Sequence, residues 1–219
     1  MTQAPAAPTI WNYDRAEIIA DGVVHAIGIV FAIIGGVVLL AIVSTPTHRA
    51  EIAPVSIYLV GLLSMLGLSA AYNLWPISPR KWLLRRLDHS SIYLLIAATY
   101  TPLIWHTNAS ALTGTLIVVW IVAAAGIVLK LGWPGRFDGL SIALYLVLGW
   151  SGILAYGPIT AALHPLTLWL IAIGGVLYSA GVPFHLWERL RFHSVIWHGF
   201  VMTAALCHYT AVVSCVMPA

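Results

Sequence analysis

Long apolar stretches alternate with short polar breaks along almost the whole chain. A helix needs about 20 mainly apolar residues to cross the hydrocarbon core of a bilayer. The stretches lack the strict apolar–polar alternation that is typical of transmembrane β-strands. The pattern therefore predicts an all-α integral membrane protein, a bundle of seven transmembrane helices over residues 19–43, 53–75, 88–106, 111–131, 138–156, 165–183 and 196–217.

The breaks between the stretches carry Pro, Gly, Ser and charged residues, as at residues 44–47, 76–81, 133–136, 156–158 and 188–191. They are too short to hold a further domain. We therefore expect a mobile N-terminal segment over residues 1–14 and a single bundle over residues 15–219. Glycine pairs at residues 35–36 and 174–175 and the small residues at 122–126 predict close helix packing.

Composition excludes the other broad classes of protein. The 219 residues are 61% hydrophobic and only 8% charged, whereas a soluble domain is about 25% charged. Intrinsic disorder requires low hydrophobicity and high charge, which this chain lacks. Two cysteines in a chain of this length also exclude a disulfide scaffold. A net charge of +3 is too small to indicate nucleic-acid binding.

The distribution of Lys and Arg predicts the orientation, because cytoplasmic loops of membrane proteins are enriched in both. With seven spans, only Arg49 falls on one side of the membrane. The N-terminus is therefore expected in the cytoplasm and the C-terminus outside, since the other side holds Arg15, Arg80, Lys81, Arg85, Arg86, Lys130, Arg136, Arg189 and Arg191.

Polar side chains inside the spans are costly and indicate function. Most of them fall in the cytoplasmic halves of four helices, with His208 lying deeper, and they predict one buried polar site that suits a metal or a proton. The site would draw on Glu17, Asp21, His25, Ser69, Asn73, Asp88, His198 and the deeper His208.

Simpler roles are open for several of these residues. Asp88 at the expected start of its helix could serve only as a cap, and Asp21 could pair only with His25, one turn away. His198 and His208 would stand about 15 Å apart along a regular helix, too far to bind one metal ion. His185 and His193, which flank the charged break before the last span, are expected at the surface.

Missing motifs exclude several chemistries. A retinal protein needs a lysine inside a late helix, and the only lysines, Lys81 and Lys130, fall in expected loops. The phosphate-binding Gly-x-x-x-x-Gly-Lys loop and the His-Glu-x-x-His zinc motif are both absent.

Five ordered motifs resemble those of the haemolysin III family, within the progestin and adipoQ receptor superfamily of seven-helix proteins. They are Glu-Ile-Ile-Ala-Asp-Gly-Val-Val-His at 17–25, Ser-Ala-Ala-Tyr-Asn at 69–73, Leu-Asp-His-Ser at 87–90, Ala-Thr-Tyr-Thr-Pro at 98–102, and Trp-His-Gly-Phe-Val at 197–201 followed by His208. The resemblance covers nearly the whole chain, and it implies the same orientation as the charge count.

The resemblance also implies a zinc template. Metal-binding members use a helix 2 histidine, two helix 7 histidines spaced i, i+4, and a helix 3 aspartate that holds the zinc-bound water. Ser69, Asp88 and His198 match this template, but Asn73 and Ser194 replace two of its three histidines. Because neutral Asn and Ser are poor zinc ligands, we expect only a weak site, with His198 and Asp88 as the metal candidates.

The resemblance and the degraded template favour a membrane homeostasis or lipid-sensing protein of the bacterial inner membrane, without robust zinc binding. Its partners would be the lipid bilayer and a bound lipid or fatty acid. The first alternative is a zinc-dependent, ceramidase-like hydrolase of lipid amides, with Asp88 and Ser69 as catalytic residues. The second is a pore-forming haemolysin, which should instead show polar residues through the full bilayer thickness.

Overall fold

The computed structural model describes residues 13–107, 110–133 and 135–217, so the N-terminal segment expected at 1–14 lies mostly outside the described residues. The described residues contain no strand. In chain order the elements are α1 (Arg15–Val43), η2 (Pro46–Glu51), α2 (Ile52–Leu74), α3 (Pro79–Thr107), α4 (Ser110–Gly132), α5 (Asp138–Trp150), η3 (Ser151–Ala155), α6 (Tyr156–Ala162), α7 (Pro165–Leu186) and α8 (His193–Val216).

Local chemistry fixes where the first helix begins. The Asp14 carboxylate accepts a hydrogen bond from the Glu17 backbone N–H, and the Glu17 carboxylate accepts one from the Asp14 N–H. This reciprocal capping box satisfies N–H groups that have no partner within the helix. The backbone N–H of Glu17 and the neighbouring Arg191 lower the pKa of Asp14. Residue 14, placed in the mobile segment by the sequence, is thus the cap of α1.

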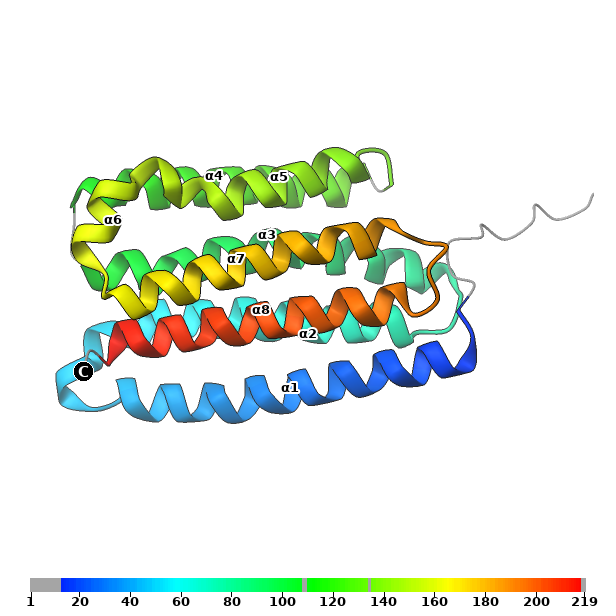
Figure 1. Cartoon of the computed structure of the whole chain (residues 1–219), viewed down its shortest axis with the longest axis horizontal. Coiled ribbons are helices and arrows are strands. Elements are labelled where there is room, and N and C mark those ends of the chain that lie inside the picture. Colours follow the sequence, from blue (N-terminus) through cyan, green and yellow to red (C-terminus); the bar gives the residue numbers. More distant parts are fainter. Residues whose placement is uncertain (1–12, 108–109, 134, 218–219) are drawn as a thin grey trace, which may run out of the picture.

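The long helices run alternately up and down and stack in layers, with α1 at one edge and α4 and α5 at the other (Figure 1). Helix α8 packs between α1 and α7, and α2 packs between α1 and α3. Helices α1 and α8 are therefore neighbours although they stand at opposite ends of the sequence. Helix α8 ends at the end of the bundle opposite the start of α1 (Figure 1).

Six described segments are long and apolar enough to cross a membrane: Arg15–Val43, Pro46–Leu74, Leu112–Gly132, Asp138–Ala162, Pro165–Leu186 and His193–Val216. Helix α3 corresponds to the remaining predicted span. It has 29 residues and runs alongside the others (Figure 1), but its first turns are basic. It begins at Pro79 rather than at the expected residue 88.

The segment predicted at residues 138–156 is not one regular helix. It consists of α5, the 3-10 turn η3 and the short α6, which continues past Gly157 and Pro158 to Ala162. The expected stop at 156–158 was wrong because Tyr156 and Gly157 enter a new first turn, where proline is tolerated.

At two of the predicted packing positions, glycine lets a large side chain of the neighbouring helix lie directly against the backbone. A Cβ at Gly126 of α4 would lie 2.4 Å from the ring of Tyr93 in α3. A Cβ at Gly174 of α7 would lie 2.3 Å from the His208 ring in α8. The larger residue fills the space beside each glycine, so the predicted close packing is confirmed at both positions.

Candidate functional site

Three helices bring five polar side chains together in the half of the bundle that contains the start of α1. We call these residues the Asp21 cluster: Asp21 and His25 from α1, Ser69 and Asn73 from α2, and His198 from α8. Asp21, His25, Ser69 and His198 are each less than 9% exposed. Buried polar groups require partners, and each of these side chains finds its partners within the cluster.

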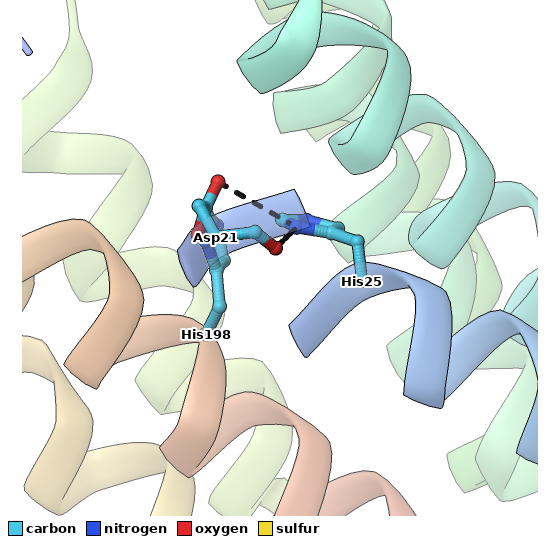
Figure 2. A group of neighbouring side chains, drawn as sticks. All are labelled: Asp21, His25 and His198. Atoms are coloured by element: carbon cyan, nitrogen blue, oxygen red, sulfur yellow. Dashed lines mark hydrogen bonds and ion pairs between the residues drawn. The ribbon is translucent and has the colours of Figure 1, made fainter. Parts of the chain in front are cut away.

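Asp21 joins the two imidazoles (Figure 2). Its Oδ1 lies 2.5 Å from His198 Nδ1, and its Oδ2 lies 3.5 Å from His25 Nδ1. The backbone oxygen of Asp21 lies closer to that atom, at 2.8 Å. Among the described residues, Asp21, His25 and His198 are the group whose candidate metal-ligand atoms all lie within 4.8 Å of one another.

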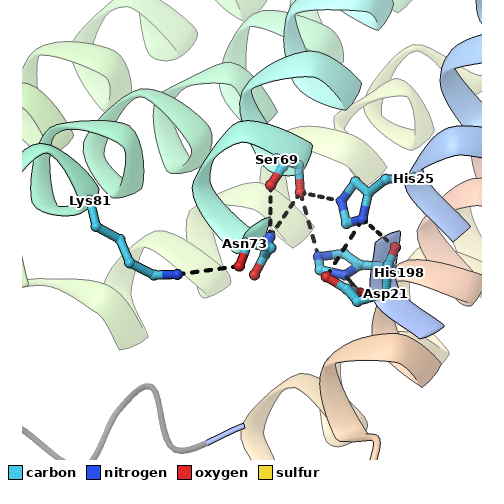
Figure 3. A network of polar contacts seen from close by, with 6 residues as sticks. All are labelled: Asp21, His25, Ser69, Asn73, Lys81 and His198. Carbon is cyan, nitrogen blue, oxygen red and sulfur yellow. Dashed lines mark hydrogen bonds and ion pairs between the residues drawn. The ribbon is translucent and has the colours of Figure 1, made fainter. Parts of the chain in front are cut away.

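Ser69 lies on the other side of the same rings (Figure 3). Its Oγ is 3.1 Å from His25 Nε2 and 3.5 Å from His198 Nε2. The Asn73 amide donates to the Ser69 backbone oxygen at 2.9 Å and to its Oγ at 3.3 Å. Lys81 Nζ donates to the backbone oxygens of Asn73, at 3.2 Å, and of Trp75, at 2.7 Å. These bonds tie the end of α2 to the start of α3.

Asp88 is buried and lies more than two turns beyond the start of α3. It therefore cannot be the N-terminal cap that its sequence position suggested. Asp88 lines the same cavity as Ser69 and His198, and these two residues and Arg85 lie close enough to act on its carboxyl group. Asp88 thus adjoins the Asp21 cluster from the side of α3.

Two residues expected in the polar site lie outside the Asp21 cluster. Glu17 accepts a hydrogen bond from the Phe192 N–H at 2.8 Å, which holds the start of α8 against α1. His208 Nε2 lies 3.2 Å from the Ile171 backbone oxygen, and its ring packs beside Tyr178. His208 thus has partners in α7, apart from the cluster that contains His198. This agrees with the expectation that one metal ion cannot bind both histidines.

A cavity of about 1040 Å³ opens beside the cluster, between α2, α3, α5, α7 and α8. At the end nearest the start of α3 its lining is polar and includes Ser69, Arg85, Asp88, Lys130 and His198. Toward the opposite end the lining is mainly apolar, with Leu95, Leu103, Ile104, Leu112, Ile159, Leu163 and Leu168. The cavity therefore has a polar end and an apolar body.

Two buried cations share one carboxylate at the polar end. Asp138 of α5 accepts from Arg85 and from Lys130, each at 2.6 Å. The side chains of Lys130 and Arg85 are only 5% and 13% exposed, whereas that of Asp138 is 37% exposed. The pairing fixes the loop between α4 and α5 against α3.

Two histidines at the polar end of the cavity are more buried than the sequence predicted. His185 and His193 were expected at the surface, but both are half-buried and line the cavity. Tyr13 lines it beside them, and its ring lies 5.7 Å from the His193 ring. Burial is the main cause that raises the pKa of Tyr13 to about 12, so its hydroxyl stays neutral at physiological pH.

A small crevice reaches the Asp21 cluster from outside. It is lined by Tyr13, Glu17, Asp21, Asn73 and Ser194 and holds about 10 Å³, room for about one water molecule. Asn73 and Ser194, which replace two template histidines, therefore border the same space from α2 and α8. Neither side chain offers the imidazole that the template has at its position.

Comparison with known proteins identifies the family. The model of haemolysin-III related proteins matches residues 16–209. The chain belongs to the haemolysin-III related family. It is 37% identical to the Hemolysin-3 homolog of Bacillus subtilis strain 168 over 187 residues, which cover 85% of this chain and 88% of the relative. It is 33% identical to Hemolysin-3 of Bacillus cereus, over 92% and 93% of the two chains.

A human protein also matches, the monocyte to macrophage differentiation factor of Homo sapiens, at 29% identity over 86% of this chain and 79% of the relative. The resemblance inferred from the five motifs is thereby confirmed. The zinc template that it implied does not fit the residues of this chain, because an amide and a hydroxyl are poor zinc ligands where two imidazoles would be needed.

Sequence reasoning placed Asp21, His25 and His198 in one polar site, but it did not predict that the Asp21 carboxylate contacts both imidazoles. The i, i+4 spacing placed Asp21 and His25 on one face of α1, and His198 was singled out as a buried imidazole. Nothing in the spacing showed that α8 closes the bundle against α1. The sequence signal for this contact was that α1 and α8 each carry polar residues at a similar distance from the cytoplasmic end of the helix.

Proposed function

We propose that this protein is a membrane homeostasis protein that binds one lipid or fatty-acid molecule in its cavity. The observation that carries the proposal is the cavity itself, with polar groups at one end and a mainly apolar lining along the rest of its length. Its volume, about 1040 Å³, slightly exceeds the range of about 300–1000 Å³ for ligand pockets, so the cavity is large enough for a lipid.

The lining matches the two parts of a lipid. The apolar body offers burial to an acyl chain, and burial contributes about 0.8 kcal/mol per methylene group. At the polar end Ser69, Asp88 and His198 offer hydrogen bonds to a headgroup. Because α5 and α7 form one side of the cavity, an occupant would hold these helices at a fixed distance from α3. The packing of α5 and α7 against α3 would therefore depend on whether a lipid occupies the cavity, and thus on how much of that lipid the membrane supplies.

A metal-dependent hydrolase of lipid amides is the second candidate. The grouping of Ser69, Asp88 and His198 at the polar end favours it, because these residues match the zinc template. The substitutions at Asn73 and Ser194 weigh against it. An aqueous pore receives less support, since the body of the cavity is mainly apolar and a water-filled path needs polar lining.

The membrane arrangement belongs to the same proposal. We place α3 across the bilayer as the seventh span, the N-terminus in the cytoplasm and the C-terminus outside, in a bacterial inner membrane. The alternating helix directions support this topology, because they bring nine of the ten Lys and Arg residues to one end of the bundle. A reporter that is active only in the cytoplasm should be inactive at the C-terminus and active at the N-terminus. The reverse result, or activity at both ends, would contradict the topology.

The Ala172→Trp variant should lose the bound lipid, because Ala172 of α7 lines the cavity and an indole would occupy its body. The matched control is Ile173→Trp, since Ile173 is the next residue, is 48% exposed and points away from the cavity. Lipid co-purifying with the full chain can be measured by mass spectrometry. We expect about a tenfold lower lipid content for Ala172→Trp, equivalent to about 1.4 kcal/mol of binding free energy, and no change for the control. Equal lipid content in all three proteins would refute lipid binding in the cavity.

A further inference from the structure

The first two turns of α3 carry basic side chains with two different fates. Lys81 donates to the end of α2, and Arg85 donates to Asp138. Arg80 is exposed and Arg86 is half-buried. Neither forms an ion pair with any of the seven acidic residues of the chain, all of which lie in the described part. Two guanidinium groups thus leave uncompensated positive charge at the start of α3.

Hydrogen-bond donors without an acceptor are buried on the same side of α3. The Nε atom of Arg86 is buried and has no hydrogen-bond partner among the described residues. The hydroxyl group of Ser90, a residue only 6% exposed, has none either. Because residues spaced i, i+4 share one face of a helix, these two groups are neighbours on α3. A buried donor without an acceptor is costly, so this face suits a ligand that brings acceptor oxygens.

Helix α4 ends before it reaches the first turns of α3. The ring of Tyr93 in α3 lies against Gly126 of α4, and the two helices run in opposite directions (Figure 1). Helix α4 ends at Gly132, which is therefore level with about residue 87 of α3. Residues 79–86 extend beyond α4, just before the apolar part of α3.

The side chains next to Arg86 on this face suit a membrane surface. Trp82, one turn before Arg86, is 37% exposed, and Leu83, three residues before it, is 54% exposed. Arg80 is in turn three residues before Leu83, so these side chains are neighbours on the helix surface. Tryptophan is enriched at the level of lipid headgroups. Exposed apolar groups beside unpaired cations therefore favour a lipid over a water-soluble partner.

We propose that Arg86 binds the phosphate group of an anionic phospholipid at this corner of the bundle, with Arg80 as a second cation on the water side. Arginine suits this role because its planar guanidinium group binds phosphate through two parallel hydrogen bonds. The phosphate oxygens bring acceptors to the face that holds Arg86 and Ser90, and Trp82 packs beside the headgroup. In the topology proposed above, this lipid belongs to the cytoplasmic leaflet. The site lies outside the cavity, so it is a second lipid site of a different class.

The test titrates the full chain, purified in detergent, with phosphatidylglycerol and counts bound lipid by native mass spectrometry. Phosphatidylcholine, which has the phosphate but no net charge, is the comparison lipid and should bind more weakly. Each Lys or Arg near an anionic membrane surface strengthens attachment about fivefold. Arg80→Gln/Arg86→Gln should therefore weaken phosphatidylglycerol binding about 30-fold. The matched control is Arg15→Gln/Arg49→Gln, which removes the same charge from two exposed arginines on other elements and should keep the affinity.

Three outcomes would overturn the site: equal affinity of the unchanged protein for both lipids, full affinity in Arg80→Gln/Arg86→Gln, or an equal loss in the control. Displacement of the lipid by inorganic phosphate alone would also overturn it, because the site would then take a free anion. The melting temperature of Arg80→Gln/Arg86→Gln should match that of the unchanged protein, since neither arginine loses an ion pair. The same 30-fold loss is expected in the Ala172→Trp background, so this inference stands or fails separately from lipid binding in the cavity.

Discussion

Replacing Asp138 with alanine is expected to lower the free energy of unfolding by about 3 kcal/mol. The substitution leaves the cations of Lys130 and Arg85 buried without their shared carboxylate. Removing one partner of a buried ion pair costs about 3–5 kcal/mol. We expect the lower end of this range because the Asp138 side chain is 37% exposed. Water can therefore partly replace the lost carboxylate as a partner of Lys130 and Arg85.

Thermal unfolding of the detergent-purified protein provides the measurement, and Arg191→Ala provides the control. Arg191 pairs with Asp14, but their side chains are 66% and 47% exposed, and exposed pairs contribute only about 0–1 kcal/mol. Asp138→Ala should therefore lower the melting temperature several times more than Arg191→Ala does. Similar small effects of both variants would show that Lys130 and Arg85 are not held in a buried ion cluster.

The Asn73→His/Ser194→His double variant should bind zinc at least about 100-fold more tightly than the unchanged protein, a gain of about 2.7 kcal/mol. Asn73 and Ser194 line the same crevice beside the Asp21 cluster. Imidazoles at both positions, together with His198 one turn beyond Ser194, would complete the ligand set of the family template. Zinc sites in proteins are built from three or four ligands of this kind, so three imidazoles should bind zinc more tightly than one.

Competition with a coloured chelator measures the gain, and Asn73→Gln/Ser194→Asn is the matched control. The control adds polar side chains at the same two positions but no imidazole, so its zinc affinity should not rise. An unchanged affinity in the histidine double variant would mean that α2 and α8 do not present these two positions to a common point.

Helix positions could be predicted well from the sequence, because uninterrupted apolar stretches and Pro-rich breaks act locally. Errors arose where a helix extends beyond its apolar part. Helix α3 begins at Pro79 because its basic first turns, with Lys81 bonded to the end of α2, are helical without being apolar. The break after α5 was misplaced because Pro158 lies in the first turn of α6, where it is compatible with a helix.

The candidate site was predictable only in part, since spacing shows which residues share a helix face but not which helices touch. Asp21 and His25 were expected on one face of α1, and they are. The contact of Asp21 with His198 depends on α8 packing against α1, which joins residues 177 positions apart in the chain. The cavity could not be predicted either, because its size depends on how far α5 and α7 stand from α3.

The most direct test of lipid binding in the cavity is an electron cryomicroscopy structure of the full chain extracted from its own membrane with the surrounding lipid. We expect elongated density in the cavity, with its polar end at Ser69, Asp88 and His198 and its tail running along Leu103 and Leu163. Helices α5 and α7 packed directly onto α3, with side chains filling the space and no such density, would contradict it.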